Sequence, residues 1–270
     1  MTKKLFCKED LRRILTELNY FNNFKDKYLN TKFNRINYGS RIGELAFDNL
    51  FDAAEKYTYS KKVAESIFKD WNRILNDENS TEENLFCGIL EIFVWGDVLS
   101  GNVKTAINLY KEKRLKGYVR QIIELLNKKE ILGKGEIESE IIWSSGWTKV
   151  YSFINNDILI YDSRVSAFLN HTLTYDIKYT EDQFKKLKEL TTNLFNFQGA
   201  ENRERLVDKK QFGFKNSSPN GINGFNANLI SSWTAELLKE ELKLENGIRD
   251  FERAFFMLGF DLKQIKTQNK

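Results

Sequence analysis

The stretch IESEIIWSSGWTKVYSFINNDILIYDSRVSAFL, residues 137–169, contains the signals that decide the fold of this chain. Isoleucines at helical spacing predict that a helix ends near Ile142, and the Ser-Ser-Gly sequence at 144–146 predicts a turn after it. Thr148 is expected to open a second, short helix, which the polar residues 155–157 end. The segment therefore predicts two helices joined by a tight turn.

The end of the same stretch brings a carboxylate to the start of a third helix. Four apolar residues, 158–161, lead directly to Asp162, and Val165 and Leu169 follow at helical spacing. An aspartate at this position is commonly an N-cap, which accepts hydrogen bonds from the first N–H groups of the helix. Two neighbouring features favour a functional role as well. The Ser-Ser-Gly turn exposes amides that suit a phosphate, and Lys149 lies just inside the second helix.

These residues resemble the helix–hairpin–helix DNA glycosylases, in particular the bacterial 8-oxoguanine DNA glycosylase-like group. The sequence Trp-Thr-Lys-Val at 147–150 is similar to the hairpin exit that carries the Schiff-base lysine of this family. The sequence Ile-Tyr-Asp at 160–162 is similar to the approach to its catalytic aspartate. Segments 228–233 and 249–259 resemble the closing helices of the group, so the resemblance extends over roughly residues 85–260.

The resemblance implies an all-α, two-lobed fold of the helix–hairpin–helix glycosylase type. A single unit of two lobes would occupy residues 1–270, with the hairpin and catalytic segment at about 136–172 and Asp162 at the floor of the cleft. The implied function is that of a DNA N-glycosylase, which flips a damaged or modified base out of double-stranded DNA and excises it. Asp162 would stabilise the positive charge that develops on the sugar. Lys149 would either attack C1′ to form a Schiff base, with lyase chemistry, or hold a phosphate.

The resemblance and the local charge also indicate which residues contact the substrate. The expected DNA contacts are Ser144, Ser145, Gly146, Trp147, Thr148, Arg164, Lys209, Lys210 and Lys215. The expected walls of the base pocket are Trp95, Asp97, Trp143, Phe255 and Phe256. Core packing is the alternative role for Trp95, because buried aromatic residues are common.

Elsewhere, three-to-four spacing and a single proline predict helices over most of the chain. One helix is expected from Ile42 to Ala54, and a nearly apolar, central one from Leu85 to Trp95. Residues 198–226 are polar and contain several lysines and arginines, which predicts a mobile basic loop that suits the DNA backbone.

Composition sets outer limits on the function. The net charge of +4 is compatible with nucleic acid but does not require it. Two cysteines and one histidine are too few for a standard zinc site or an iron–sulfur cluster, so no metal and no cofactor are expected. No apolar run is long enough to span a bilayer, and the first residues do not look like a signal peptide. We therefore expect a monomer without a membrane partner, located in the cytoplasm and associated with the nucleoid in a bacterium.

Two other classes of function stay open at this stage. A helical DNA-binding protein could keep the hairpin without catalysis, and Asp162 would then be only a helix cap. A helical scaffold that binds another protein could instead use the basic loop as its contact surface. Salt-dependent DNA binding separates the scaffold from the other two, and base release separates the enzyme from the passive binder.

Overall fold

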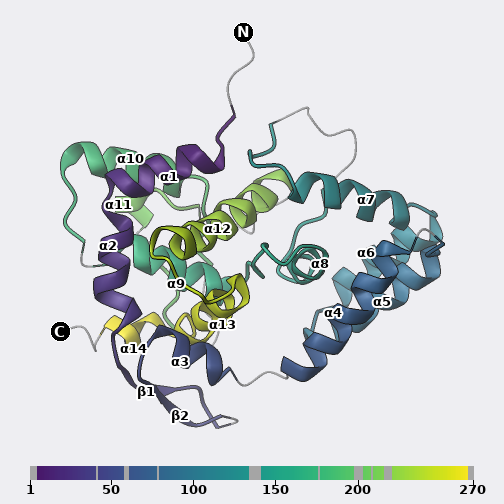
Figure 1. Cartoon of the computed structure of the whole chain (residues 1–270), viewed down its shortest axis with the longest axis horizontal. Coiled ribbons are helices and arrows are strands. Elements are labelled where there is room, and N and C mark those ends of the chain that lie inside the picture. Colours follow the sequence, from purple (N-terminus) through teal and green to yellow (C-terminus); the bar gives the residue numbers. More distant parts are fainter. Residues whose placement is uncertain are drawn as a thin grey trace.

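A computed structural model describes most of the chain, namely residues 5–40, 42–57, 61–77, 79–133, 141–175, 177–197, 203–207, 209–215 and 221–266. The described residues are mostly helical, with one small antiparallel sheet of two strands (Figure 1). The expected largely helical class is therefore confirmed. None of the described helices combines the length and the apolar character needed to cross a membrane.

The described elements form two lobes (Figure 1). The terminal lobe joins both ends of the chain and consists of α1 (Lys8–Glu17), α2 (Tyr20–Phe24), the π-helix η1 (Lys25–Leu29), β1 (Phe33–Asn37), β2 (Glu44–Phe47), α3 (Leu50–Glu55), α9 (Ser163–Thr174), α10 (Glu181–Thr191), α11 (Lys209–Phe212), α12 (Gly221–Glu241), α13 (Ile248–Leu258) and α14 (Leu262–Lys266). The middle lobe consists of α4 (Lys61–Asn76), α5 (Glu82–Trp95), α6 (Ser100–Lys111), α7 (Leu115–Leu126) and α8 (Trp147–Ile154).

Helices α9, α12 and α13 form the centre of the terminal lobe. Every residue of α9 from Val165 to Thr174 is buried, and α13 packs against both α9 and α3. Helix α12 is buried almost all round from Gly224 to Ala235, so it runs through the interior instead of along the surface. The end of α13 lies against the start of α9, where Asp162 is, because a Cβ at Gly259 would meet the backbone of Arg164.

The helix expected from Ile42 to Ala54 is only partly correct. Glu44–Phe47 is a strand that pairs antiparallel with Phe33–Asn37, and a helix begins only at Leu50. Gly39 and Gly43 lie in the turn of this hairpin at positive φ angles of 86° and 79°, a conformation that favours glycine. Long-range packing of Phe33 and Phe47, both buried, therefore outweighs the local helical spacing.

The basic loop expected over 198–226 is also wrong in part. Residues 209–212 form α11, and α12 already begins at Gly221. Several side chains of the segment, including Arg205 and Phe214, are buried and thus anchor it to the terminal lobe. Residues 198–202, 208 and 216–220 of this expected loop lie outside the described residues.

The prediction that a helix ends near Ile142 is wrong. Ile141 and Ile142 have no regular secondary structure, and Ile137 lies outside the described residues. The carbonyl of Ile142 accepts a hydrogen bond from the hydroxyl of Tyr151, and its N–H donates to the hydroxyl of Tyr118. These bonds take the place of helical ones, so the turn at 144–146 follows residues 141–143, which have no regular secondary structure.

Candidate functional site

The turn before α8 is fixed by the start of α6. The hydroxyl of Ser144 donates to Oδ1 of Asn102 over 2.6 Å and accepts from the backbone N–H of Trp147 over 3.1 Å. Gly146 is buried, and a Cβ at this position would lie 2.6 Å from Cγ1 of Val98. A larger residue would push the turn away from α6, which explains the glycine.

The first residues of α8 are buried, and this corrects two expected DNA contacts. Trp147 has no exposed surface, and its ring makes edge contacts with Phe93 and Tyr118, with centroids 5.6 and 5.7 Å away. Thr148 is fully buried too, and its hydroxyl donates to the carbonyl of Ser145. Both side chains belong to the core of the middle lobe, because an amphipathic helix this short buries one whole face.

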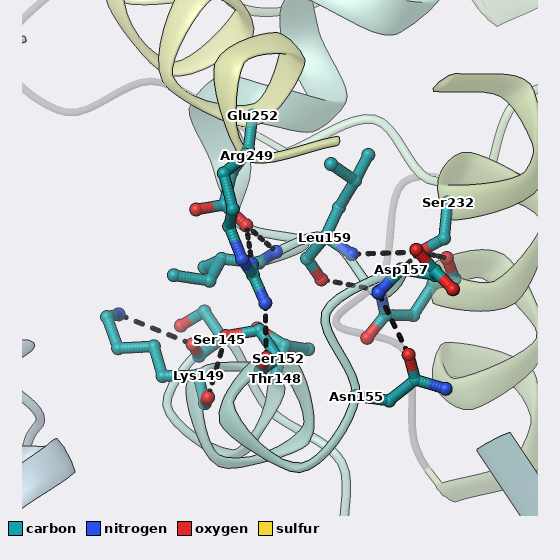
Figure 2. Close-up of polar contacts among 12 residues, drawn as sticks. Ser145, Thr148, Lys149, Ser152, Asn155, Asp157, Leu159, Ser232, Arg249 and Glu252 are labelled. Carbon is teal, nitrogen blue, oxygen red and sulfur yellow. Dashed lines mark hydrogen bonds and ion pairs between the residues drawn. The ribbon is translucent and has the colours of Figure 1, made fainter. Parts of the chain in front are cut away.

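Lys149 lies on the other face of α8 and is half-buried. Its Cδ and Cε atoms pass directly over Gly96, where a Cβ would lie 2.7 Å from Cε. The amine donates a long hydrogen bond of 3.4 Å to the carbonyl of Ser145 (Figure 2). Burial lowers the pKa of Lys149, whereas the carboxylates of Asp162, Glu252 and Asp97 act to raise it.

The irregular segment 158–161 is held between α12 and α13. The N–H of Leu159 donates to Oγ of Ser232 over 3.0 Å (Figure 2), and the side-chain amide of Asn228 donates to the Leu159 carbonyl over 2.8 Å. The N–H of Ile160 donates to Oε2 of Glu252 over 2.6 Å. These bonds satisfy buried backbone groups that no sheet partner could reach, and they position the residue that follows.

Asp162 is the N-cap of α9, as its sequence position predicts. Its Oδ1 accepts from the N–H groups of Arg164 and Val165 over 2.8 and 2.9 Å. Among the described residues Oδ2 accepts no hydrogen bond, so this oxygen is available to a bound molecule. Capping therefore does not exclude a chemical role, because it engages only half of the carboxylate.

Lys149 and Asp162 both line two adjoining cavities, which share these two residues. The first has a volume of about 210 Å³ and is lined by Tyr57, Trp95, Gly96, Asp97, Lys149, Ile160, Asp162, Arg164, Val165, Glu252 and Phe256. The second has a volume of about 350 Å³ and is lined by Trp143, Ser144, Ser145, Lys149, Asp162, Ser163 and Phe197. The first cavity takes residues from both lobes, so it lies at the junction between them.

The expected base-pocket residues divide between these cavities and the core. Trp95, Asp97 and Phe256 line the first cavity, whereas Trp143 lines the second and stacks on Phe197 at 6.3 Å. Phe255 is a correction. It is fully buried on the side of α13 that faces the core, where its ring packs against Phe24 and Phe168. It therefore cannot line a pocket.

The basic residues expected at the DNA surface also divide. Arg164 lines the first cavity, and its guanidinium lies 4.2 Å from the ring centroid of Phe256. Lys215 is exposed, 5.6 Å from the ring centroid of Phe195, and lines neither cavity. The side chains of Lys209 and Lys210 lie outside the described residues.

Beside Asp162 lies an arginine cluster, made of Arg164, Arg203 and Arg205. Arg164 and Arg203 lie 4.9 and 4.1 Å from the ring centroid of Phe260. Arg205 is buried and donates to Oγ of Ser163 over 2.6 Å. Burial, followed by the nearby charge of Arg164, lowers the pKa of Arg205 to about 10. Positive charge this dense next to a helix N-terminus suits an anion.

Sequence analysis missed several residues that shape the site. Tyr57 and Glu252 come from segments far from Asp162 in the chain, and no local pattern connects them with it. Arg203 and Arg205 were seen only as part of a basic segment. The sequence could still have marked Glu252 as unusual, although not as a neighbour of Asp162. A glutamate among the apolar residues of a buried helix face needs a polar partner.

Comparisons of the chain with protein-family models, with curated proteins and with solved structures find no match. The chemistry of the site therefore rests on its own residues.

Proposed function

We propose that the protein is a DNA N-glycosylase of helix–hairpin–helix type that excises a damaged or modified base from duplex DNA. The observation that carries this proposal is the pair of Lys149 and Asp162 in shared cavities at the junction of the lobes. An amine whose pKa is lowered by burial is a better nucleophile near neutral pH, because more of it is unprotonated. A carboxylate with one free oxygen suits a developing positive charge.

In this reaction Asp162 stabilises the sugar while the glycosidic bond breaks. Positive charge spreads over C1′ and the ring oxygen, and a fixed carboxylate next to them lowers the free energy of that transition state. The cap hydrogen bonds from Arg164 and Val165 hold the carboxylate in place, so it need not reorganise during the reaction.

Lys149 is the proposed nucleophile. Its Nζ forms a bond to C1′ as the bond from C1′ to the base nitrogen breaks, and the base leaves with a proton. The nitrogen lone pair then forms the C1′=N bond as the C1′–O4′ bond breaks and O4′ takes up a proton, which gives a protonated imine, a Schiff base, from which the strand can be cleaved. The alternative is attack by water, with Lys149 holding a phosphate.

Several features support DNA as the partner. A base inside a duplex is out of reach, so it must leave the stack and enter a cavity, where Trp95 and Phe256 of the first cavity offer aromatic faces. Ser144 and Ser145 line the second cavity, and the arginine cluster stands beside the start of α9. These groups suit the phosphates on either side of an extruded nucleotide.

The test is borohydride trapping on duplexes that carry an abasic site, together with base release from a panel of lesions. We expect a covalent adduct that is lost in Lys149→Gln, and base release that collapses in Asp162→Asn while folding and DNA affinity survive. Lys25→Gln, a change at an exposed lysine of η1, is the matched control. Base release without trapping would mean that water is the nucleophile. Equal behaviour of wild type and Asp162→Asn on every substrate would leave only passive DNA binding.

A further inference from the structure

A third cavity, of about 150 Å³, adjoins the first one on the side away from the hairpin turn. It shares Tyr57, Trp95, Ile160 and Glu252 with the first cavity, so the two cavities meet along these residues. Its own residues come from α4, α8 and α13, including Ala64 and Phe153, and from Asn156 just after α8. We propose that this side compartment takes a planar, uncharged substituent on the excised base, so that the substrate class is bases enlarged by an apolar adduct.

The proposal rests on the proposed function, since the base must first enter the cavity beside Lys149 and Asp162. For a base that stacks on Trp95, the residues shared by the two cavities mark where a substituent would pass from the first cavity into the side compartment. An unmodified base would leave the side compartment unfilled, whereas an enlarged base would fill both. Burial of additional apolar surface would then favour the enlarged base.

Four aromatic side chains line the side compartment. The rings of Trp95 and Phe153 meet edge to face with centroids 5.4 Å apart, and Phe68 lies 6.3 Å from Phe153. Tyr57 lines the compartment as well. Such rings contact a flat apolar group over a large area, and offset or edge contacts between aromatic groups contribute about 0.5–1.5 kcal/mol beyond burial.

Charge in the compartment is balanced. Two carboxylates, Glu65 and Glu252, and two guanidiniums, Arg249 and Arg253, line it. Nη1 of Arg249 donates to Oε2 of Glu252 over 2.6 Å, and Nη2 donates to the carbonyl of Ser152 (Figure 2). The Arg249–Glu252 pair is thus already hydrogen-bonded within the protein. A charged substituent would lose its hydration here without finding an excess of opposite charge. The compartment therefore favours an uncharged substituent.

The experiment compares three duplexes that carry an abasic site, 8-oxoguanine, or a guanine with a polycyclic aromatic group on its exocyclic amine. The variant Ala64→Phe fills the side compartment from α4, and Val63→Phe, at an exposed position of the same helix, is its control. We expect wild type to release the enlarged guanine faster than 8-oxoguanine. Ala64→Phe should lower release of the enlarged base at least about tenfold, with unchanged trapping on the abasic duplex and unchanged release of 8-oxoguanine. Val63→Phe should behave as wild type.

Calorimetric titration with the free enlarged guanine separates this inference from the proposed function. Absence of trapping and of all base release would overturn the proposed function. Binding of the free base to wild type but not to Ala64→Phe would still support the compartment in that case. The inference is overturned if wild type neither binds nor releases the enlarged base. It is equally overturned if Ala64→Phe handles that base as wild type does, or loses both substrates alike.

Discussion

The amine of Lys149 is subject to opposing influences on its pKa. Burial lowers the pKa, and three carboxylates, those of Asp162, Glu252 and Asp97, act to raise it. Asp97 is the exposed one of the three, and its φ angle of 49° is a left-handed conformation that asparagine adopts more readily than most residues. It can therefore lose its charge without a change in the backbone.

We predict that Asp97→Asn shifts the pH dependence of covalent trapping to lower pH. The substitution removes a charge that favours the ammonium form, so the pKa of Lys149 falls and the free amine becomes available at a lower pH. The shift should be small, because water screens an exposed charge. Single-turnover trapping rates from mildly acidic to alkaline pH measure it, with Asp26→Asn in η1 as control. A profile that moves upward would contradict the assignment of Lys149.

Gly96 controls where the amine lies. A Cβ here would meet Cδ and Cε of Lys149, and these atoms belong to the flexible end of a side chain. The φ angle of Gly96, −84°, is open to any residue, so alanine should not strain the backbone.

Gly96→Ala should therefore displace the Lys149 amine while the fold stays intact. A displacement of about 1 Å can lower a rate about 100-fold, and we expect trapping to slow by that order. Thermal unfolding should stay equal to wild type or rise slightly, since alanine restricts the unfolded chain. The control is Gly101→Ala, where an added Cβ meets no atom within 4 Å. Normal trapping by Gly96→Ala would show that the exact position of Lys149 is unimportant.

At the scale of elements, the run from the turn at 144–146 through α9 could be predicted from the sequence alone. Its turn, short helix and capped third helix depend on neighbours in the chain, and the structure confirms them. The burial of Trp147 and Thr148 could not be predicted in this way. It depends on Phe93 and Tyr118 of other helices, and these decide which face of α8 is covered.

The segment 158–161 offers an element-scale prediction, because α12 holds it in place. Ser232→Ala removes the acceptor of the Leu159 N–H, and a buried N–H without an acceptor costs about 1–3 kcal/mol. We expect the free energy of unfolding to fall by that amount in urea titrations. Base release should fall as well, since Asp162 lies three residues after Leu159.

Thr234→Val is the matched control for that change. Among the described residues, the Thr234 hydroxyl donates only to the carbonyl of Ile230 within α12, and valine keeps the shape of threonine. The control should leave base release unchanged. If Ser232→Ala lost stability but kept full activity, α12 would stabilise the fold without positioning Asp162.

At the scale of the whole molecule, sequence reasoning reached the helical class but not the way in which distant segments meet. Tyr57, Trp95 and Glu252 share one cavity although nearly two hundred residues separate the first from the last. Only tertiary packing brings them together, and hydrophobic spacing contains no information about that pairing. The β-hairpin was missed for the same reason, because its strands are stabilised by packing against the terminal lobe and not by a local pattern.

The buried side chain of His171 gives a prediction for global stability. It is fully buried, stacks on Tyr175 with centroids 4.5 Å apart, and lies 5.9 Å from Tyr28 of η1. Among the described residues, neither ring nitrogen has a hydrogen-bond partner. Burial, together with the charges of Lys266 and Lys27, lowers the pKa of His171 from 6.5 to about 3.

We predict that His171→Phe stabilises the protein and flattens its response to acid. Between pH 6.5 and about 3 the unfolded chain binds a proton at His171 that the folded protein does not. The contribution of neutral His171 to the free energy of unfolding is therefore fully present above pH 6.5. It falls by about 1.4 kcal/mol per pH unit as the pH decreases through that interval. His171 is the one histidine of the chain, so the difference between wild type and variant isolates its contribution. Urea titrations at several pH values should show the variant about 1–3 kcal/mol more stable at neutral pH, since phenylalanine leaves no nitrogen unpaired, with the gap widening in acid. A constant gap would mean that His171 reaches water in the folded state.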